Sequence, residues 1–230
     1  MKIAIIPARG GSKRIPRKNI KIFDGKPIIA CAIDAATDSG LFEHVVVTTD
    51  DIEVANIARD LGAETPFLRP ADLSDDLCGT VPVIAHAVEE CLQLGWEIDF
   101  ACCIYPAVPF LRTTDLKDSY DAILESNADY CFPVARHKLP IQRAIRLRGA
   151  FNLTKPLFTQ YEKIRTQDLE PTYYDAGQFY WGKATAWLDK KEIFSNGSAF
   201  IVSSDRAIDI DTPDDWNNAQ LLKNKLNPSV

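Results

Sequence analysis

The sequence predicts an α/β fold in which a mostly parallel β-sheet lies between helices on both faces. Three observations lead to this prediction. Short apolar runs alternate with segments of helical periodicity along most of the chain, a succession typical of βαβ units. One run, Val45-Val46-Val47-Thr48-Thr49, is continuously apolar and β-branched, as expected of a strand buried on both faces. The 230 residues, 46% of them hydrophobic, suffice for one large domain or two small ones.

Boundary residues help to place the elements. Gly40 and Gly62 each follow a helical segment, and glycine commonly ends a helix. Asp50 or Asp51 supplies an N-cap for the helix before Gly62. The expected elements are, in order, a strand over 2–7, a helix over 28–37, a strand over 45–49, a helix ending at 61, a strand over 64–68, a helix over 81–94, a strand over 99–105, a helix over 114–126 and a strand over 128–134.

Several polar or charged residues directly follow expected strands. They are Arg9, Asp50, Arg69 and Tyr105. Open parallel sheets bind their ligands at the carboxyl ends of the strands. We therefore expect these four side chains to line one crevice.

Residues 136–175 interrupt the alternation of strands and helices. Arg and Lys mix there with prolines and aromatic residues, without a helical period. A segment of this length with no structure of its own is unusual in a compact domain. We expect a β-rich excursion from a single domain over residues 1–230, with a mobile loop as the alternative.

Composition limits the classes of function. The formal net charge is −6, and the lack of an extended basic face outside the first loop argues against nucleic acid as a partner. The apolar runs are too short for a membrane span, and the apolar start is too short for a signal peptide, so we expect a cytoplasmic protein. The six cysteines lack C-x-x-C spacing, which favours reduced, buried thiols over a zinc site.

A Gly-rich, basic loop follows the first strand, in the stretch IIPARGGSKRIPRKN (residues 5–19). Residues 9–26 carry seven Lys or Arg side chains and one Asp, a local charge of +6. Neither a Walker A loop nor a Rossmann fingerprint occurs, and Pro16 and Pro27 keep the segment irregular. Side chains and loop amides are therefore expected to hold phosphates, with a solvated basic loop as the alternative. Arg14 is expected to point to solvent.

A pair of carboxylates stands near the end of the chain. A strand there would place Asp209 and Asp211 on one face. Two like charges on one face are relieved by a hard cation, and Mg²⁺ accepts one or two carboxylates together with phosphate oxygens. We predict a Mg²⁺ site at this pair. Thr212 and Pro213 are expected to begin a helix, with the two acids after them in structural positions.

These motifs resemble those of the CMP-sialic acid synthetases (acylneuraminate cytidylyltransferases). The basic loop resembles the N-terminal signature of the family, RPADLSDD (residues 69–76) resembles its R-P-x-x-L-x-x-D segment, and IDIDT (residues 208–212) resembles its metal motif. The resemblance extends along the whole chain. It implies a Rossmann-like three-layer nucleotidyltransferase fold and a bacterial or archaeal cytoplasmic homodimer. The excursion would then be a dimerisation arm that closes the partner's sugar site.

The same resemblance assigns a CTP site. Arg69 would reach the cytosine, Arg9, Lys13 and Lys18 would be the chief catalytic cations on the triphosphate, and Asp211 would act through the metal. The residues expected at CTP are Ala8, Arg9, Gly10, Gly11, Ser12, Lys13, Lys18, Asn19, Arg69, Cys78 and Thr80.

A sugar site is also implied. Tyr105 stands where the sialic acid enzymes of the family have a Gln, and this departure is typical of members that act on pseudaminic acid. Arg143 or Arg165 could pair with the sugar carboxylate, with a surface or interface salt bridge as the alternative. The residues expected at the sugar are Tyr105, Gln142, Arg143, Arg165, Gln178, Phe179 and Tyr180.

The reaction implied is CTP plus pseudaminate giving CMP-pseudaminate and diphosphate, for surface glycans or flagellin. The anomeric hydroxyl would attack the α-phosphate in line, so positioning and charge stabilisation would dominate catalysis. Three alternatives remain open. They are the same reaction on legionaminate, N-acetylneuraminate or an octulosonate, a nucleotidyltransferase of neutral sugar 1-phosphates, and a nucleotide-binding sensor on the same fold.

Overall fold

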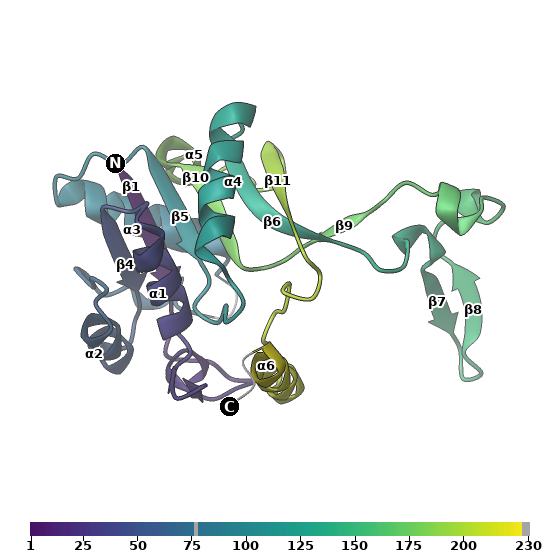
Figure 1. The fold of residues 1–230 in the computed structure, drawn as a ribbon, viewed down its shortest axis with the longest axis horizontal. Coiled ribbons are helices and arrows are strands. Elements are labelled where there is room, and N and C mark those ends of the chain that lie inside the picture. The colour runs from purple at the N-terminus through teal and green to yellow at the C-terminus, as the bar shows by residue number, and fades with distance from the viewer. Residues whose placement is uncertain (76–77, 227–230) are drawn as a thin grey trace.

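The computed structural model describes residues 1–75 and 78–226, and a seven-stranded sheet lies at its centre (Figure 1). The strand order is β11-β6-β10-β5-β1-β4, and β9 pairs with the end of β6. Strands β9 and β10 run against the other five. The strands are β1 (Lys2–Pro7), β4 (His44–Thr48), β5 (Phe100–Ile104), β6 (Tyr130–Arg136), β9 (Tyr173–Asp175), β10 (Phe179–Lys183) and β11 (Gly197–Val202).

Helices cover both faces of this sheet. Helices α1 (Ala30–Ser39), α2 (Ile52–Asp60) and α4 (Thr113–Ser126) pack on one face, in a core with alternate strand residues such as Ile6. Helices α3 (Thr80–Gln93) and α5 (Ala184–Leu188) pack on the other face, in a second core that includes Ile5. The neighbours Ile5 and Ile6 thus point into opposite cores, as the period of a strand requires.

Helix α6 (Pro213–Leu226) packs beside the hairpin of β2 (Ile22–Phe23) and β3 (Lys26–Pro27). The Phe23 and Trp216 rings meet edge to face, with centroids 5.4 Å apart. This contact brings the C-terminal part of the chain against the end of the basic loop. In the described part of the chain, the helices are too short or too polar to cross a membrane.

The mostly parallel, helix-covered sheet confirms the predicted fold class. Two details differ from the expectation. Residues 64–68 form no strand, and Glu64 makes a single bridge to Val46. Strand β10 lies antiparallel between β5 and β6, which the alternation along the chain did not indicate.

The excursion extends away from the sheet as an arm (Figure 1). It contains one hairpin, β7 (Ile145–Arg148) with β8 (Leu153–Pro156), and three 3₁₀ turns over residues 141–143, 159–161 and 166–168. Large apolar side chains on the arm are exposed, with Phe151 90% and Leu139 80% accessible. An apolar surface of this kind on a projecting element marks an interaction surface.

Candidate active site

A cleft of about 320 Å³ opens at the carboxyl ends of β1 and β5. Its lining side chains come from the basic loop, from the segment leading into α3, and from the chain after β5. The cleft also brings in Asp211, which is far away in the sequence. The predicted residues that line it are Arg9, Ser12, Lys13, Lys18, Asn19, Arg69, Cys78, Thr80, Tyr105 and Asp211.

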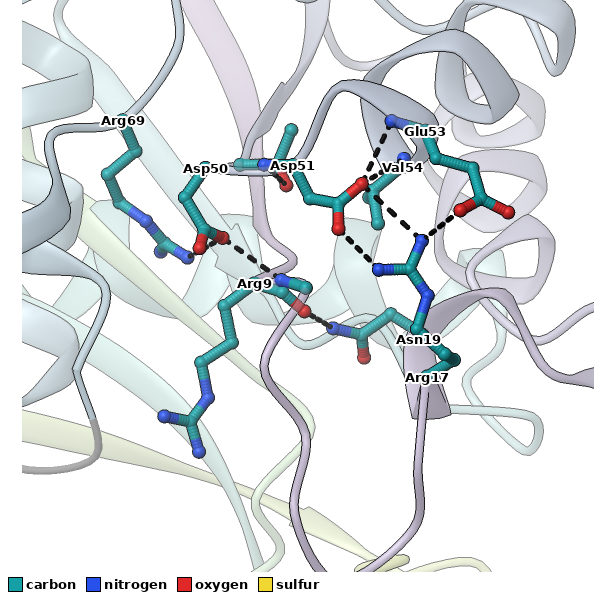
Figure 2. A network of polar contacts seen from close by, with 10 residues as sticks. Arg9, Arg17, Asn19, Asp50, Asp51, Glu53, Val54 and Arg69 are labelled. Carbon is teal, nitrogen blue, oxygen red and sulfur yellow. Dashed lines mark hydrogen bonds and ion pairs between the residues drawn. The ribbon is translucent and has the colours of Figure 1, made fainter.

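Hydrogen bonds to Asp50, which was expected to line the cleft but does not, and within the loop itself hold the basic loop (Figure 2). The Asp50 carboxylate accepts the Gly10 N–H at 3.0 Å and lies 3.9 Å from Arg69 Nη2. The Asn19 amide donates to the Arg9 carbonyl at 3.0 Å. Burial lowers the pKa of Arg69, which is only 6% exposed, and the Asp50 charge opposes that shift. Asp50 therefore connects the basic loop with a buried guanidinium.

Arg17 anchors the same loop to α2. Its backbone is left-handed, with φ of 56°, and its guanidinium pairs with Asp51 and Glu53. Asp51 caps α2 by accepting the N–H groups of Glu53 at 2.9 Å and Val54 at 3.2 Å. The hydrogen bond from Arg17 and these two backbone donors lower the pKa of Asp51. The carboxylate therefore stays ionised and fixes the loop against a helix end.

The contact between Gly10 and Asp51 leaves no room for a side chain. A Cβ on Gly10 would lie 2.3 Å from Asp51 Oδ2, whereas one on Gly11 would meet no atom of the described residues within 4 Å. Asp51 is held by Arg17 and by its capping bonds to α2, so its side chain cannot move away without losing these contacts. We expect Gly10→Ala to cost about 1–3 kcal/mol of unfolding free energy. Gly11→Ala is the matched control.

The measurements are thermal denaturation and CTP titration of both variants. Gly10→Ala is expected to lower the melting temperature and to weaken CTP binding at least about 10-fold. Gly11→Ala is expected to melt near the wild type. Equal melting temperatures for the two variants would contradict the tight contact.

Asp211 is flanked by two cations of the basic loop. Arg14 Nη2 lies 2.9 Å from Oδ2, and Lys18 Nζ lies 3.3 Å from Oδ1. Lys18 also donates to the Ile210 carbonyl at 2.6 Å. Arg14 was expected to face solvent, and this was wrong in part: its side chain is 66% exposed but contacts Asp211. The loop and the distant carboxylate thus form one charged surface.

The two aspartates do not lie on a strand, which corrects the prediction. Residues 203–212 form no regular element, so the alternation of Asp209 and Asp211 does not come from a sheet. Partial burial and the Asp211 charge raise the pKa of Asp209. The described residues contain no group of three or more His, Cys, Asp or Glu side chains that could hold a metal ion. Two neighbouring carboxylates still fit Mg²⁺, since this ion takes one or two carboxylates and completes its shell with phosphate and water.

Helix α6 begins at Pro213 after Thr212, as predicted, and the capping is reciprocal. The Asp215 N–H donates to Thr212 Oγ1 at 3.2 Å, and the Asp215 carboxylate accepts the Thr212 N–H at 2.8 Å. The hydrogen bonds that the Thr212 hydroxyl and N–H donate to this carboxylate lower the pKa of Asp215. The same carboxylate accepts the Asp211 N–H at 3.2 Å. The helix end therefore fixes the backbone directly after the aspartate pair.

A second hollow of about 480 Å³ adjoins the cleft and shares Gly79, Thr80 and Tyr105 with it. Thr80 Oγ1 and the Tyr105 hydroxyl are 2.6 Å apart, and the Tyr180 hydroxyl donates to Asp175 at 2.6 Å. Burial raises the pKa of Tyr105 to about 12, and that of Tyr180 still further. Both phenols are therefore neutral hydrogen-bonding groups at physiological pH.

Comparison with known proteins shows the family to which this chain belongs. The family model described as Cytidylyltransferase matches residues 3–205. The chain belongs to the cytidylyltransferase family. It is a nucleotidyltransferase, and the cleft beside the basic loop is the candidate active site of the enzyme.

Individual relatives extend the comparison. The enzyme is 39% identical over 221 residues to a pseudaminic acid cytidylyltransferase of Campylobacter jejuni, covering 96% of this chain and 95% of that protein. It is 31% identical over 218 residues to the CMP-N,N′-diacetyllegionaminic acid synthase of Legionella pneumophila, with 93% and 92% covered. A solved CMP:2-keto-3-deoxy-manno-octonic acid synthetase complexed with CTP shares the fold, with a TM-score of 0.73, 15% identity, and 98% and 99% of the chains covered.

The structure does not bring all predicted sugar residues to the enzyme's cleft. Gln178 is 1% exposed and Phe179 is 0% exposed, so both belong to the interior rather than to a ligand surface. Arg143 donates to the carbonyls of residues 161, 162 and 164. Gln142 donates to the Glu170 carbonyl, and Arg165 pairs with Asp168. Gln142, Arg143 and Arg165 therefore lie within the arm, and their contacts stabilise the fold of the arm.

Some residues at the site were not predicted. The pairing of Arg17 with Asp51, itself a predicted N-cap, carries no motif signal, because it depends on contact between two segments distant in sequence. Asp175 lines the second hollow, and its place beside Tyr180 follows only from the pairing of β9 and β10 with β6. In the sequence, the position of Asp175 directly after Tyr173 and Tyr174 was the available signal of a site residue.

Proposed function

We propose that the enzyme transfers a cytidylyl group from CTP to pseudaminate, a nine-carbon acidic sugar, giving CMP-pseudaminate and diphosphate. Pseudaminic acid cytidylyltransferases are 39% identical to this chain over nearly its full length, against 31% for the legionaminic acid enzyme, which supports this substrate. The six free cysteines are consistent with a reducing cytoplasm as the place of the reaction.

One observation carries the proposal. A cleft that unites the basic loop, Arg69 and Asp211 adjoins a hollow lined by Tyr105, Tyr180 and Asp175. The first space has the cations that a triphosphate needs, and the second has the aromatic faces and polar groups that a sugar needs. The two spaces meet at Tyr105, where the donor phosphate and the acceptor hydroxyl would come together.

The chain's own residues act chiefly by positioning and by charge. Arg9, Lys13 and Lys18, together with the loop amides, would bind the triphosphate and stabilise the charge that develops as diphosphate leaves. Arg69, fixed by Asp50, would contact the nucleotide from the opposite wall. The neutral Tyr105 hydroxyl, held by Thr80, would orient the sugar for attack in line with the leaving diphosphate.

Asp209 and Asp211 would hold Mg²⁺. When bound, this ion supplies positive charge to the phosphate oxygens of the nucleotide. The Arg14 and Lys18 contacts keep the Asp211 carboxylate at the edge of the cleft, facing the site where those phosphates would lie.

The arm supports the proposal of a homodimer. Its large apolar side chains are exposed in the single chain, including Leu139, Ile145, Leu147, Phe151 and Leu153. A second copy of this chain would cover them in a symmetric pair. Arg165 on the arm would then be available to the partner's site rather than to its own. This arrangement keeps residues 1–230 as one catalytic unit with a protruding arm.

The test of the substrate is product analysis by mass spectrometry with CTP and a panel of nonulosonic acids. We expect a kcat/KM at least about 10-fold higher for pseudaminate than for N-acetylneuraminate, because a polar sugar group left unpaired against Tyr105 costs roughly 1–3 kcal/mol. Tyr105→Gln is expected to lower the ratio of kcat/KM for pseudaminate to kcat/KM for N-acetylneuraminate.

Other outcomes separate the alternatives. Equal kcat/KM values for the two sugars would refute the pseudaminate assignment and leave cytidylyl transfer intact. Diphosphate release from CTP with a neutral sugar 1-phosphate, but not with an acid sugar, would overturn the proposed class of acceptor. Nucleotide binding without any turnover would favour a sensor.

A further inference from the structure

The segment that carries the aspartate pair has no sheet to hold it. Residues 203–212, between β11 and α6, form no strand or helix. Within the segment, the Arg206 N–H donates to Ser203 and the Ile208 N–H donates to the Arg206 carbonyl, both at 3.0 Å. These are local turns, which do not fix the segment relative to the rest of the molecule. Contacts from other elements must therefore place Asp209 and Asp211.

A buried ion pair attaches this segment to the start of α4. The Arg206 guanidinium binds both oxygens of Asp115, and the two side chains are 15% and 6% exposed. Arg206 Nη1 also donates to the Phe110 carbonyl at 3.3 Å. Asp115 is itself fixed, because it accepts the Arg112 N–H at 3.1 Å at the beginning of the helix. This bidentate contact therefore fixes the segment at Arg206, three residues before Asp209.

Gln178 attaches the same point to the wall of the cleft. Its side chain is buried, and its Nε2 donates to the Arg206 carbonyl at 2.6 Å. Its backbone carbonyl accepts the Tyr105 N–H at 2.9 Å. Gln178 therefore joins Tyr105, which lines both hollows, to the segment that carries the aspartates. Its Oε1 is buried and has no hydrogen-bond partner among the described residues, a cost that packing alone does not explain.

The energetics favour a positioning role over a purely stabilising one. Removing two charges from water can cost as much free energy as their attraction returns, so a buried ion pair is weak support for stability. An unsatisfied amide oxygen adds to the cost. What these groups supply is a fixed geometry, since the bidentate Arg–carboxylate contact allows one orientation.

We propose that Asp115, Arg206 and Gln178 are positioning residues that fix Asp209 and Asp211 relative to Lys18 and Tyr105. This proposal rests on the proposed function, in which the aspartate pair binds the divalent cation. Loosening the segment would move the carboxylates relative to the nucleotide phosphates, and cation affinity should fall before the fold is lost.

The experiment measures Mn²⁺ binding in the presence of CTP, by electron paramagnetic resonance, for Gln178→Leu, Arg206→Met and Arg206→Lys. We expect the Mn²⁺ dissociation constant to rise at least about 10-fold in Gln178→Leu and Arg206→Met. Arg206→Lys, which keeps the charge but not the planar fork, should be intermediate. The Mg²⁺ concentration for half-maximal turnover should rise in parallel, with kcat largely recovered at saturating Mg²⁺.

Tyr130→Phe is the matched control. Tyr130 is fully buried and donates to the carbonyls of Ala186 at 2.9 Å and Lys191 at 3.2 Å, on the α5 side of the sheet. It therefore loses a comparable side chain-to-backbone hydrogen bond far from the aspartates. We expect a lower melting temperature and an unchanged Mn²⁺ dissociation constant. If Arg206→Met fails to fold, Gln178→Leu still tests the proposal, because this variant keeps the Arg206–Asp115 ion pair.

Asp211→Asn separates this proposal from the proposed function. If Asp211→Asn weakens Mn²⁺ binding while the Gln178 and Arg206 variants bind like the wild type, the positioning role is overturned and the metal site stands. If Asp211→Asn binds Mn²⁺ normally, the metal site is overturned and the positioning role falls with it. Lower melting temperatures with no change in Mn²⁺ affinity would reduce the three residues to a structural role.

Discussion

Replacing Asp211 with Asn is expected to lower kcat by about 10² to 10³, equivalent to about 3 kcal/mol of transition-state stabilisation. The substitution keeps the size of the side chain but removes the charge that sits between Arg14 and Lys18. Without it, Arg14 and Lys18 lose the negative charge between them, and the proposed Mg²⁺ site loses one of its two carboxylates. The measurement is steady-state turnover with CTP and pseudaminate across a Mg²⁺ titration.

Asp214→Asn is the control for this prediction. Asp214 is exposed in the first turn of α6 and lies only three residues away in the sequence. Its loss should leave turnover near that of the wild type. Near-normal activity of Asp211→Asn over the whole Mg²⁺ range would show that the carboxylate takes no part in the reaction.

Replacing Lys18 with Met is expected to lower kcat/KM for CTP by about 10² or more. Lys18 lies in the basic loop and, like Arg14, contacts Asp211, and it also donates to the Ile210 carbonyl. Its loss removes a charge from the triphosphate and also releases the aspartate segment. Both kcat and the KM for CTP should therefore change, rather than one alone.

Lys26→Met is the corresponding control. Lys26 belongs to the same basic stretch, but its exposed side chain pairs with Asp34 on α1. If the basic stretch acted only through its summed charge, the two variants would lose similar activity. A loss confined to Lys18 identifies the loop as a specific phosphate site.

The basic loop could be predicted because its signals are local. Glycines, prolines and cations adjoin one apolar strand, and a strand end in a parallel sheet already implies a ligand edge. The IDID alternation, in contrast, has the period of a strand, but no neighbouring strand pairs with it in the described structure. Alternation specifies a strand only where a sheet edge is available to receive it.

Gln178 and Arg143 were predicted at the sugar, and in the single chain both donate to backbone carbonyls that the sequence did not indicate. A polar residue among aromatic ones looks the same whether it meets a sugar or a backbone carbonyl. Gln178 meets the Arg206 carbonyl, and Arg143 meets carbonyls of its own arm. Such partners lie 18 to 28 residues away and depend on how the chain returns to the sheet. Hydrogen bonds of this kind leave no trace in residue spacing.

The central position of β10 governs the order in which the molecule can be assembled. This strand is made late in synthesis, yet it fills the gap between β5 and β6. Until it arrives, the nascent chain exposes two unpaired edges in the middle of its sheet, a state that invites pairing with other chains. Closure also demands contacts between residues far apart in sequence, which slows folding. The sheet is therefore completed only after the arm has been synthesised, and until then these edges stay open to pairing with other chains.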